Sequence, residues 1–249
     1  MAQQCAICGA QVNMLSRTKL KDGNFICSKC MKLGLCFFAY PFADIEKVKA
    51  HHKQVERGKQ LWDHFFVPRL KPQDKSKALK KCKPIFIAED IGLMAIREVR
   101  SVFIFFNRSE HFCVYRIADL SAYNLQVKTN TKIQDGKTKK STSYSLGFLF
   151  ENVDGLNIFE INYSKGKCKK MIKYLDGLFG IKTKTKGALA ELKNSWNVMK
   201  DMKSEGKKLS SLTMEDVKVE MLKKSSNYRE GDRTRWIEKA DKALSELNN

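Results

Sequence analysis

The sequence predicts an α+β protein with three parts: a small metal-binding module, an antiparallel β sandwich or barrel capped by a helix, and a C-terminal helical tail. Two Cys-x-x-Cys pairs near the start predict the module. Short runs rich in Phe, Ile, Val and Tyr, separated by Gly, Asn and Asp, predict the sheet. Apolar residues at helical spacing after these runs predict the capping helix and the tail.

Composition and charge place the chain among globular proteins. Of its 249 residues 43% are hydrophobic, and 47 Lys and Arg against 27 Asp and Glu give a formal net charge of +20. Its apolar stretches are far shorter than the roughly 20 residues that cross a bilayer. The first residues also lack a basic segment followed by an apolar one. We therefore expect a cytoplasmic protein without a transmembrane segment, whose cysteines are reduced.

Four closely spaced cysteines form the strongest motif. Cys5 and Cys8 make one Cys-x-x-Cys pair, and Cys27 and Cys30 make a second. Because a gap of two residues lets both thiolates of one turn reach the same ion, two such turns supply the four soft ligands of a closed tetrahedral zinc site. We therefore predict a structural zinc ion in a small zinc ribbon or treble clef. Cys36 lies in an apolar stretch and is expected in the core.

Changes of pattern along the chain divide it into four segments. The first holds the paired cysteines, the second is the most basic, the third carries the strand-like runs, and the fourth is helical in pattern. We assign 1–40 to a four-cysteine zinc ribbon, 41–84 to a basic helical connector, 85–182 to a β domain with a C-terminal capping helix, and 183–249 to a helical tail.

The connector is expected to contain one amphipathic helix. Apolar residues recur at helical spacing from Ala43 to Phe66. Pro41 and Pro68 bracket this range, and an interruption is expected near Gly58. A stretch rich in Lys and Pro follows and joins the helix to the β domain.

The β domain is predicted from runs with high β propensity. Asp135-Gly136 and Asp154-Gly155 mark two of its turns, and the second joins the two runs that form the clearest hairpin. After the last run, an apolar face at Lys167 to Phe179 predicts a helix that caps the sheet. The expected strands are IFIAED, VRSVFIFF, FCVYRI, SAYNLQVK, STSYSLGFLF and LNIFEINY.

The tail is expected to be helical. Ala188 to Met202 is periodic, and Thr213 with Asp216 resembles a capping box that has Asp in place of the usual Glu or Gln. A further helix is expected from about Arg233 to Leu247. Because few aromatic residues support these helices, we expect the tail to fold against a partner.

Two resemblances to known families add to this interpretation. The opening CAICGAQVNMLSRTKLKDGNFICSKC resembles a zinc-ribbon domain of unknown function found at the start of many Gram-positive bacterial and phage proteins. The middle of the chain, with FIFFN, VYRIADLSAY and the closing hairpin and helix, is similar to a bacterial pleckstrin-homology-like (PH-like) β domain. This resemblance implies a seven-stranded bent sheet capped by a helix, a binding role and no reaction.

Motifs for catalysis are not found in the sequence. It contains no GxSxG elbow, no GxxxxGK[ST] phosphate loop, no GxGxxG and no HExxH. His51 and His52 are neighbours and cannot both face one ion from a helix, so packing or surface positions are expected for the histidines. We therefore expect a protein that is not an enzyme and has no small-molecule substrate.

The function predicted from the sequence is that of a zinc-containing adaptor or regulatory protein, encoded by a Gram-positive bacterium or its phage, that binds a protein partner. Nucleic-acid binding is the alternative, because a charge of +20 favours contact with phosphates. Lipid attraction is a third option, but no helix has the aromatic-rich, strongly basic pattern that would make it specific. The candidate nucleic-acid-binding residues are Arg17, Lys19, Lys21, Lys80, Lys81 and Lys83.

Overall fold

The chain forms two compact units. The computed structural model describes residues 3–71, 79–103, 106–134, 137–181 and 233–248. The first unit comprises Met1–Asp119, Asn152–Asn157 and Thr234–Asn249, and the second comprises Leu120–Glu151 and Ile158–Arg233. The first unit therefore combines three separate stretches of sequence, including the last helix of the expected tail.

The first unit begins with a small module of two β hairpins and a helical turn. Its elements are β1 (Gln3–Gln4), β2 (Gln11–Val12), β3 (Arg17–Lys19), β4 (Phe25–Cys27) and α1 (Ser28–Met31). β1 pairs with β2, and β3 pairs with β4. Between β3 and β4, Gly23 has a φ of 86°, a left-handed conformation that glycine adopts without steric cost.

A helical segment follows the module, and it is unbroken from Ile45 to Leu70. It consists of a 3-10 turn η1 (Tyr40–Phe42), α2 (Ile45–Leu61), a π-helical turn η2 (Trp62–Phe66) and α3 (Val67–Leu70). Asp44 caps α2, and its carboxylate accepts a hydrogen bond from the Lys47 N–H at 2.8 Å. The expectations of a break near Gly58 and an end before Pro68 are wrong. Pro68 is accommodated because it lies at the start of α3, directly after the wide π turn.

The sheet of the first unit packs against α2. Its strands are β5 (Lys80–Cys82), β6 (Ile85–Ala88), β7 (Leu93–Phe103) and β8 (Phe106–Arg116), all antiparallel and in this order. Gly58 permits the close contact of α2 with β8, because a Cβ at this position would lie 2.2 Å from the Phe112 carbonyl oxygen. β5 begins at Lys80, inside the range expected for the connector.

Aromatic side chains fill the core between the helical segment and the sheet. The ring of Trp62 stacks on that of Phe112 with centroids 4.7 Å apart, and it meets the Phe86 ring edge-on at 5.0 Å. Leu61, Phe65 and Phe66 extend the same buried cluster along the helical segment.

Helix α7 (Thr234–Asn248) completes this core from the other end of the chain. Ala240 and Ala243 belong to the buried cluster, and Trp236 is 2% exposed. Gly92 has a φ of 65°, and a Cβ there would lie 2.7 Å from the Trp236 carbonyl oxygen. The ion pair of Arg116 with Asp241, at 3.1 Å, adds a polar contact between β8 and α7.

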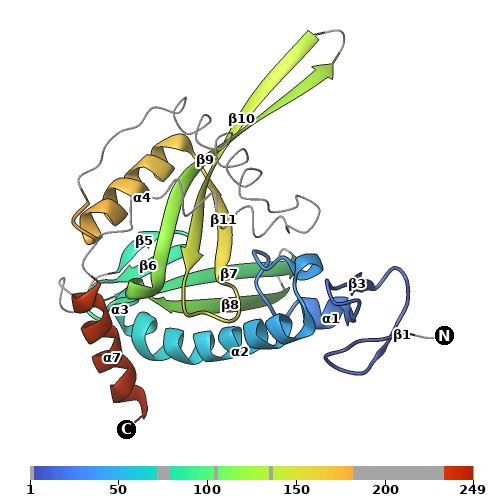
Figure 1. The fold of residues 1–249 in the computed structure, drawn as a ribbon, viewed down its shortest axis with the longest axis horizontal. Coiled ribbons are helices and arrows are strands. Elements are labelled where there is room, and N and C mark those ends of the chain that lie inside the picture. Colours follow the sequence, from blue (N-terminus) through green and yellow to red (C-terminus); the bar gives the residue numbers. More distant parts are fainter. Residues whose placement is uncertain (1–2, 72–78, 104–105, 135–136, 182–232, 249) are drawn as a thin grey trace, which may run out of the picture. The chain divides into compact units, whose positions relative to one another are not determined.

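The second unit is a three-stranded antiparallel sheet with a helix on it. Its elements are β9 (Leu120–Gln134), β10 (Lys137–Phe150), β11 (Ile158–Tyr163) and α4 (Lys165–Leu178), with strand order β11-β10-β9. β9 pairs along the whole of β10, whereas β11 pairs only with Tyr144 to Leu149 of β10. The β9–β10 ribbon therefore extends beyond β11 (Figure 1).

These observations confirm the α+β class, the antiparallel pairing, the capping helix and the last helix of the tail. The seven strands β5 to β11 form two sheets, and among the described residues these sheets do not close into a barrel. In the same part of the chain no helix is long and apolar enough to cross a membrane. The helix expected at 188–202 and the capping box at 213–216 lie outside the described residues.

Candidate metal centre

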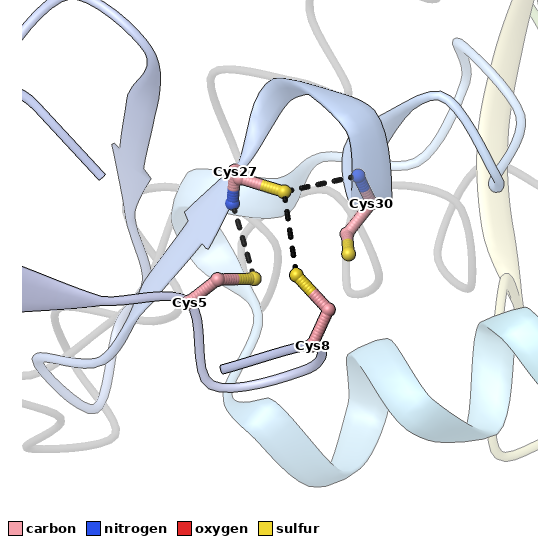
Figure 2. A group of neighbouring side chains, drawn as sticks. All are labelled: Cys5, Cys8, Cys27 and Cys30. Carbon is pink, nitrogen blue, oxygen red and sulfur yellow. Dashed lines mark hydrogen bonds between the residues drawn. The ribbon is translucent and has the colours of Figure 1, made fainter. Parts of the chain in front are cut away.

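The first ligand pair lies in the turn between β1 and β2. The Cys5 N–H donates to the Ala10 carbonyl, and the Gly9 N–H donates to the Cys5 carbonyl, both at 2.8 Å. Gly9 has a φ of 71°, which other residues rarely adopt. This tight turn directs the Cys5 and Cys8 thiols to the same side (Figure 2).

The second ligand pair lies where β4 meets α1. Cys27 is the N-cap of α1, and its Sγ accepts a hydrogen bond from the Cys30 N–H at 3.4 Å. The Cys27 N–H donates to the Cys5 Sγ at 3.3 Å, which ties the two turns together. Because an N–H donor favours a charged acceptor, the hydrogen bond from Cys27 favours the thiolate form of Cys5.

The four sulfur atoms converge on one point, as Figure 2 shows. The ligand atoms of Cys5, Cys8, Cys27 and Cys30 lie within 4.8 Å of one another. A tetrahedral zinc ion with Zn–S bonds of about 2.3 Å would place its sulfur ligands about 3.8 Å apart, and the Sγ atoms of Cys8 and Cys27 are 3.8 Å apart. The cluster therefore has the donor set and the size of a four-thiolate metal site.

The thiols of the cluster differ in pKa. Burial acts to raise the pKa of Cys5, but hydrogen bonds from the Cys27 and Cys8 backbone outweigh it and lower the pKa to about 6. Burial raises the pKa of Cys30 well above its usual value, and the thiols of Cys8 and Cys27 add to the increase. A dication that displaced the remaining protons would stabilise all four groups as thiolates.

A buried histidine anchors the loop that follows α1. The Nε2 atom of His51 on α2 accepts a hydrogen bond from the Leu35 N–H at 3.0 Å, and its ring stacks on Phe38 with centroids 4.3 Å apart. Because Nε2 accepts, Nδ1 carries the proton and donates to the Gln54 Oε1 at 3.1 Å. Burial lowers the pKa of His51 to about 4. The packing role expected for this histidine is confirmed.

An ion pair on β7 holds the same loop. Arg100 donates to both carboxylate oxygens of Glu98, at 2.7 and 3.0 Å, and to the Gly34 carbonyl at 2.7 Å. Glu98 in turn accepts a hydrogen bond from the Cys36 N–H at 2.7 Å. Cys36 is exposed, so its expected place in the core is wrong. Its backbone binds a charged side chain at the sheet and does not enter the apolar core.

The candidate nucleic-acid-binding residues lie on two elements of the first unit. Lysines in both sets are exposed, whereas the Arg17 guanidinium is half-buried and lies 4.6 Å from the centre of the Phe25 ring. Their role stays a prediction. The six residues are Arg17 and Lys19 in β3, Lys21 two residues after Lys19, Lys80 and Lys81 in β5, and Lys83 directly after β5.

The hairpins, the helical turn and the sulfur cluster fit a zinc-ribbon-like domain. Residues 3–48 match a family model described as a domain of unknown function, DUF4428. The match spans all four cysteines and ends within the first turn of α2. No curated protein and no solved structure matches the chain.

Proposed function

We propose that the protein is a zinc-containing binding protein, not an enzyme, in which the metal stabilises the N-terminal module. The convergence of four thiols, all within 4.8 Å, carries this proposal. A zinc ion held by four protein ligands has no open position for water or substrate, so it acts on folding and not on chemistry. The free energy of zinc binding would stabilise a module whose hairpins have strands of two or three residues.

The β strands support a PH-like assignment as part of this proposal. The resemblance implies seven strands followed by a helix, and β5 to β11 followed by α4 agree with that number, although the strands form two sheets and not one. β11 is an edge strand of its sheet, and an extended segment of a protein partner would pair with it by backbone hydrogen bonds. The origin from a Gram-positive bacterium or phage stays part of the same expectation.

Metal analysis tests the role of the zinc ion. Purified protein is expected to contain one equivalent of zinc, and Co(II) in its place should show the ligand-field spectrum of a tetrahedral four-thiolate site. A spectrum that changes when small anions are added would reveal an open coordination position and contradict the structural role.

Substitution of single ligands tests the residues. Cys5→Ser and Cys27→Ser are each expected to release zinc and to raise amide exchange in residues 3–32, because three thiolates do not complete the tetrahedron. The sheet of the first unit should keep its protection. Cys36→Ser is the matched control and should retain the metal, since Cys36 is outside the cluster. A Cys27→Ser variant with one full equivalent of zinc would contradict the assignment.

Nucleic-acid binding is a second candidate function, favoured by the net charge of +20. Each phosphate that a lysine neutralises releases a counterion, so the affinity should fall steeply with salt. Titration of the zinc-loaded protein into labelled DNA and RNA duplexes at two salt concentrations tests this. Weak affinity for both kinds of duplex even at low salt would contradict this function and would indicate that the positive charge serves only solubility.

A further inference from the structure

The exposed face of α4 in the second unit carries five lysines and no acidic residue. Its lysines are all exposed, and its one acidic residue, Asp176, is 1% exposed. Within the described part of the chain, none of these lysines forms an ion pair. They are Lys165, Lys167, Lys169, Lys170 and Lys173. We propose that this basic face of α4 is the surface through which the protein contacts the phosphate backbone of a nucleic acid, an inference that rests on the second candidate function above.

The opposite face of α4 is fixed to the sheet. The Tyr123 hydroxyl of β9 donates a hydrogen bond to the buried Asp176 carboxylate at 2.6 Å. Met171 and Leu175 are buried on this side of the helix, which packs on all three strands of the sheet. The buried face thus uses the acidic residue and the apolar residues of α4. The lysines are left on a helix that is already ordered, which reduces the entropy lost when a ligand binds.

The placement of these lysines weakens the helix unless an anion is present. Lys165 and Lys169, and Lys169 and Lys173, are four residues apart, where like charges repel each other. The first turn contains Lys165 and Lys167 and no acidic residue, although the positive end of the helix dipole favours acidic residues there. A phosphate backbone would remove both unfavourable effects.

Other described helices offset their basic side chains with acidic ones to different degrees. α2 carries Glu46, which pairs with Lys49 at 2.8 Å, and Lys59 pairs with Asp63 one turn further on. α7 carries three acidic residues and three basic ones. α2 still has five basic residues against two acidic ones, so the difference is that among the described residues none of the α4 lysines has an ion-pair partner.

The chemistry of the basic face favours a nucleic acid over a lipid bilayer. A helix that binds at a bilayer surface inserts its apolar face, but the apolar face of α4 is buried against β9, β10 and β11. None of the large exposed hydrophobic side chains among the described residues belongs to α4. The exposed face of α4 therefore offers the positive charges of its lysines, which suit the dense phosphates of duplex DNA or RNA. Contacts of lysine with phosphates position a protein on the duplex without recognising its sequence.

A comparison of two triple variants tests the location. Lys169→Gln, Lys170→Gln and Lys173→Gln together remove three charges from α4, and glutamine keeps a similar helix propensity. Lys80→Gln, Lys81→Gln and Lys83→Gln remove the same charge from β5 and the residue after it. Both proteins are titrated by fluorescence anisotropy against a labelled DNA duplex and an RNA duplex at several salt concentrations. Their melting temperatures are measured in parallel.

The α4 variant is expected to lose at least about tenfold in affinity at the lowest salt, and its slope of log K against log salt should fall by about 3. Its melting temperature should not drop, since the substitutions remove repulsion. The β5 variant tests the competing site that the sequence suggests. Because the proposal assigns the phosphate contact to α4 in place of Lys80, Lys81 and Lys83, this variant should keep the slope to within about 1. An equal loss in both variants, or a greater loss in the β5 variant, would overturn the α4 site while nucleic-acid binding stands.

Two further results separate the site from the function. If the unaltered protein does not bind either duplex even at low salt, nucleic-acid binding itself fails, and the α4 site fails with it. The same proteins are then added to vesicles of phosphatidylcholine with phosphatidylserine. Binding to these vesicles that depends on the three α4 lysines, without binding to duplexes, would overturn the proposal in favour of a lipid surface.

Discussion

The clustering of the four cysteines was predictable because their chemistry is local in sequence. Two residues separate the members of each pair, and a tight turn alone brings their sulfur atoms together. The contacts of His51 and Glu98 were not predictable. His51 accepts a hydrogen bond from the backbone of Leu35, and Glu98 accepts one from the backbone of Cys36, which is 62 positions away. A pattern of side chains does not show which backbone N–H group a side chain will bind, so the contacts of His51 and Glu98 could be found only in the structure.

The buried imidazole of His51 makes the stability depend on pH. Its folded pKa of about 4 is below the unfolded value of 6.5, so this group gives its full stabilisation above pH 6.5. The stabilisation is lost as the pH falls from 6.5 toward 4, and the shift corresponds to roughly 3 kcal/mol. Imidazole nitrogen NMR shifts of the zinc-loaded protein, recorded at decreasing pH, should show His51 neutral at pH 5. Protonation of His51 near pH 6.5 in the folded protein would contradict this.

At the scale of elements, most strands follow from β propensity, and the exceptions have a physical cause. β5 contains two lysines and was assigned to the connector, because its partner β6, not its own composition, makes it a strand. The helix from Ile45 passed its expected breakpoint at Gly58 for a similar reason. At Gly58 the sequence alone indicates a weak point in the helix, because glycine has a low helix propensity. The structure shows instead that glycine is required there, because α2 lies too close to β8 for a Cβ.

Two glycines in helices should respond in opposite directions to the same substitution. Gly58→Ala should destabilise the protein by more than 1 kcal/mol, since the Cβ would clash with the Phe112 carbonyl oxygen and outweigh the gain of about 1 kcal/mol in helix propensity. Gly177→Ala on α4 has nothing within 4 Å of its Cβ and should be neutral or stabilising by up to about 1 kcal/mol. Chemical denaturation measures both. A Gly58→Ala protein as stable as the parent would contradict the packing of α2 on β8.

At the scale of the whole molecule, the sequence did not reveal which parts share a core. The last helix was expected in a separate tail, yet α7 lies in the same unit as the zinc-ribbon-like module. Its small residues Ala240 and Ala243 fit the aromatic cluster around Trp62. Alanines on a helix give no signal for such a partner, because their spacing fits a solvated helix equally well.

Truncation of a single α7 side chain should test this shared core. Trp236→Ala is expected to lower the free energy of unfolding by about 3 to 5 kcal/mol, the usual cost of removing a buried Trp. Ile237→Ala, at a position that is 40% exposed, is the matched control and should cost less than about 1 kcal/mol. The zinc content should stay at one equivalent in both variants, because all metal ligands lie between residues 5 and 30. Similar losses for the two variants would show that α7 does not pack as described.

The position of α7 also determines when the first unit can fold during synthesis. Cys5 to Cys30 are translated before α7, so the N-terminal module can form while that helix is still being made. The aromatic cluster of the same unit stays open on one side until Thr234 to Asn248 have been translated. During that interval Trp62 and its neighbours would be exposed on the nascent chain, where a chaperone that recognises apolar surface would bind them.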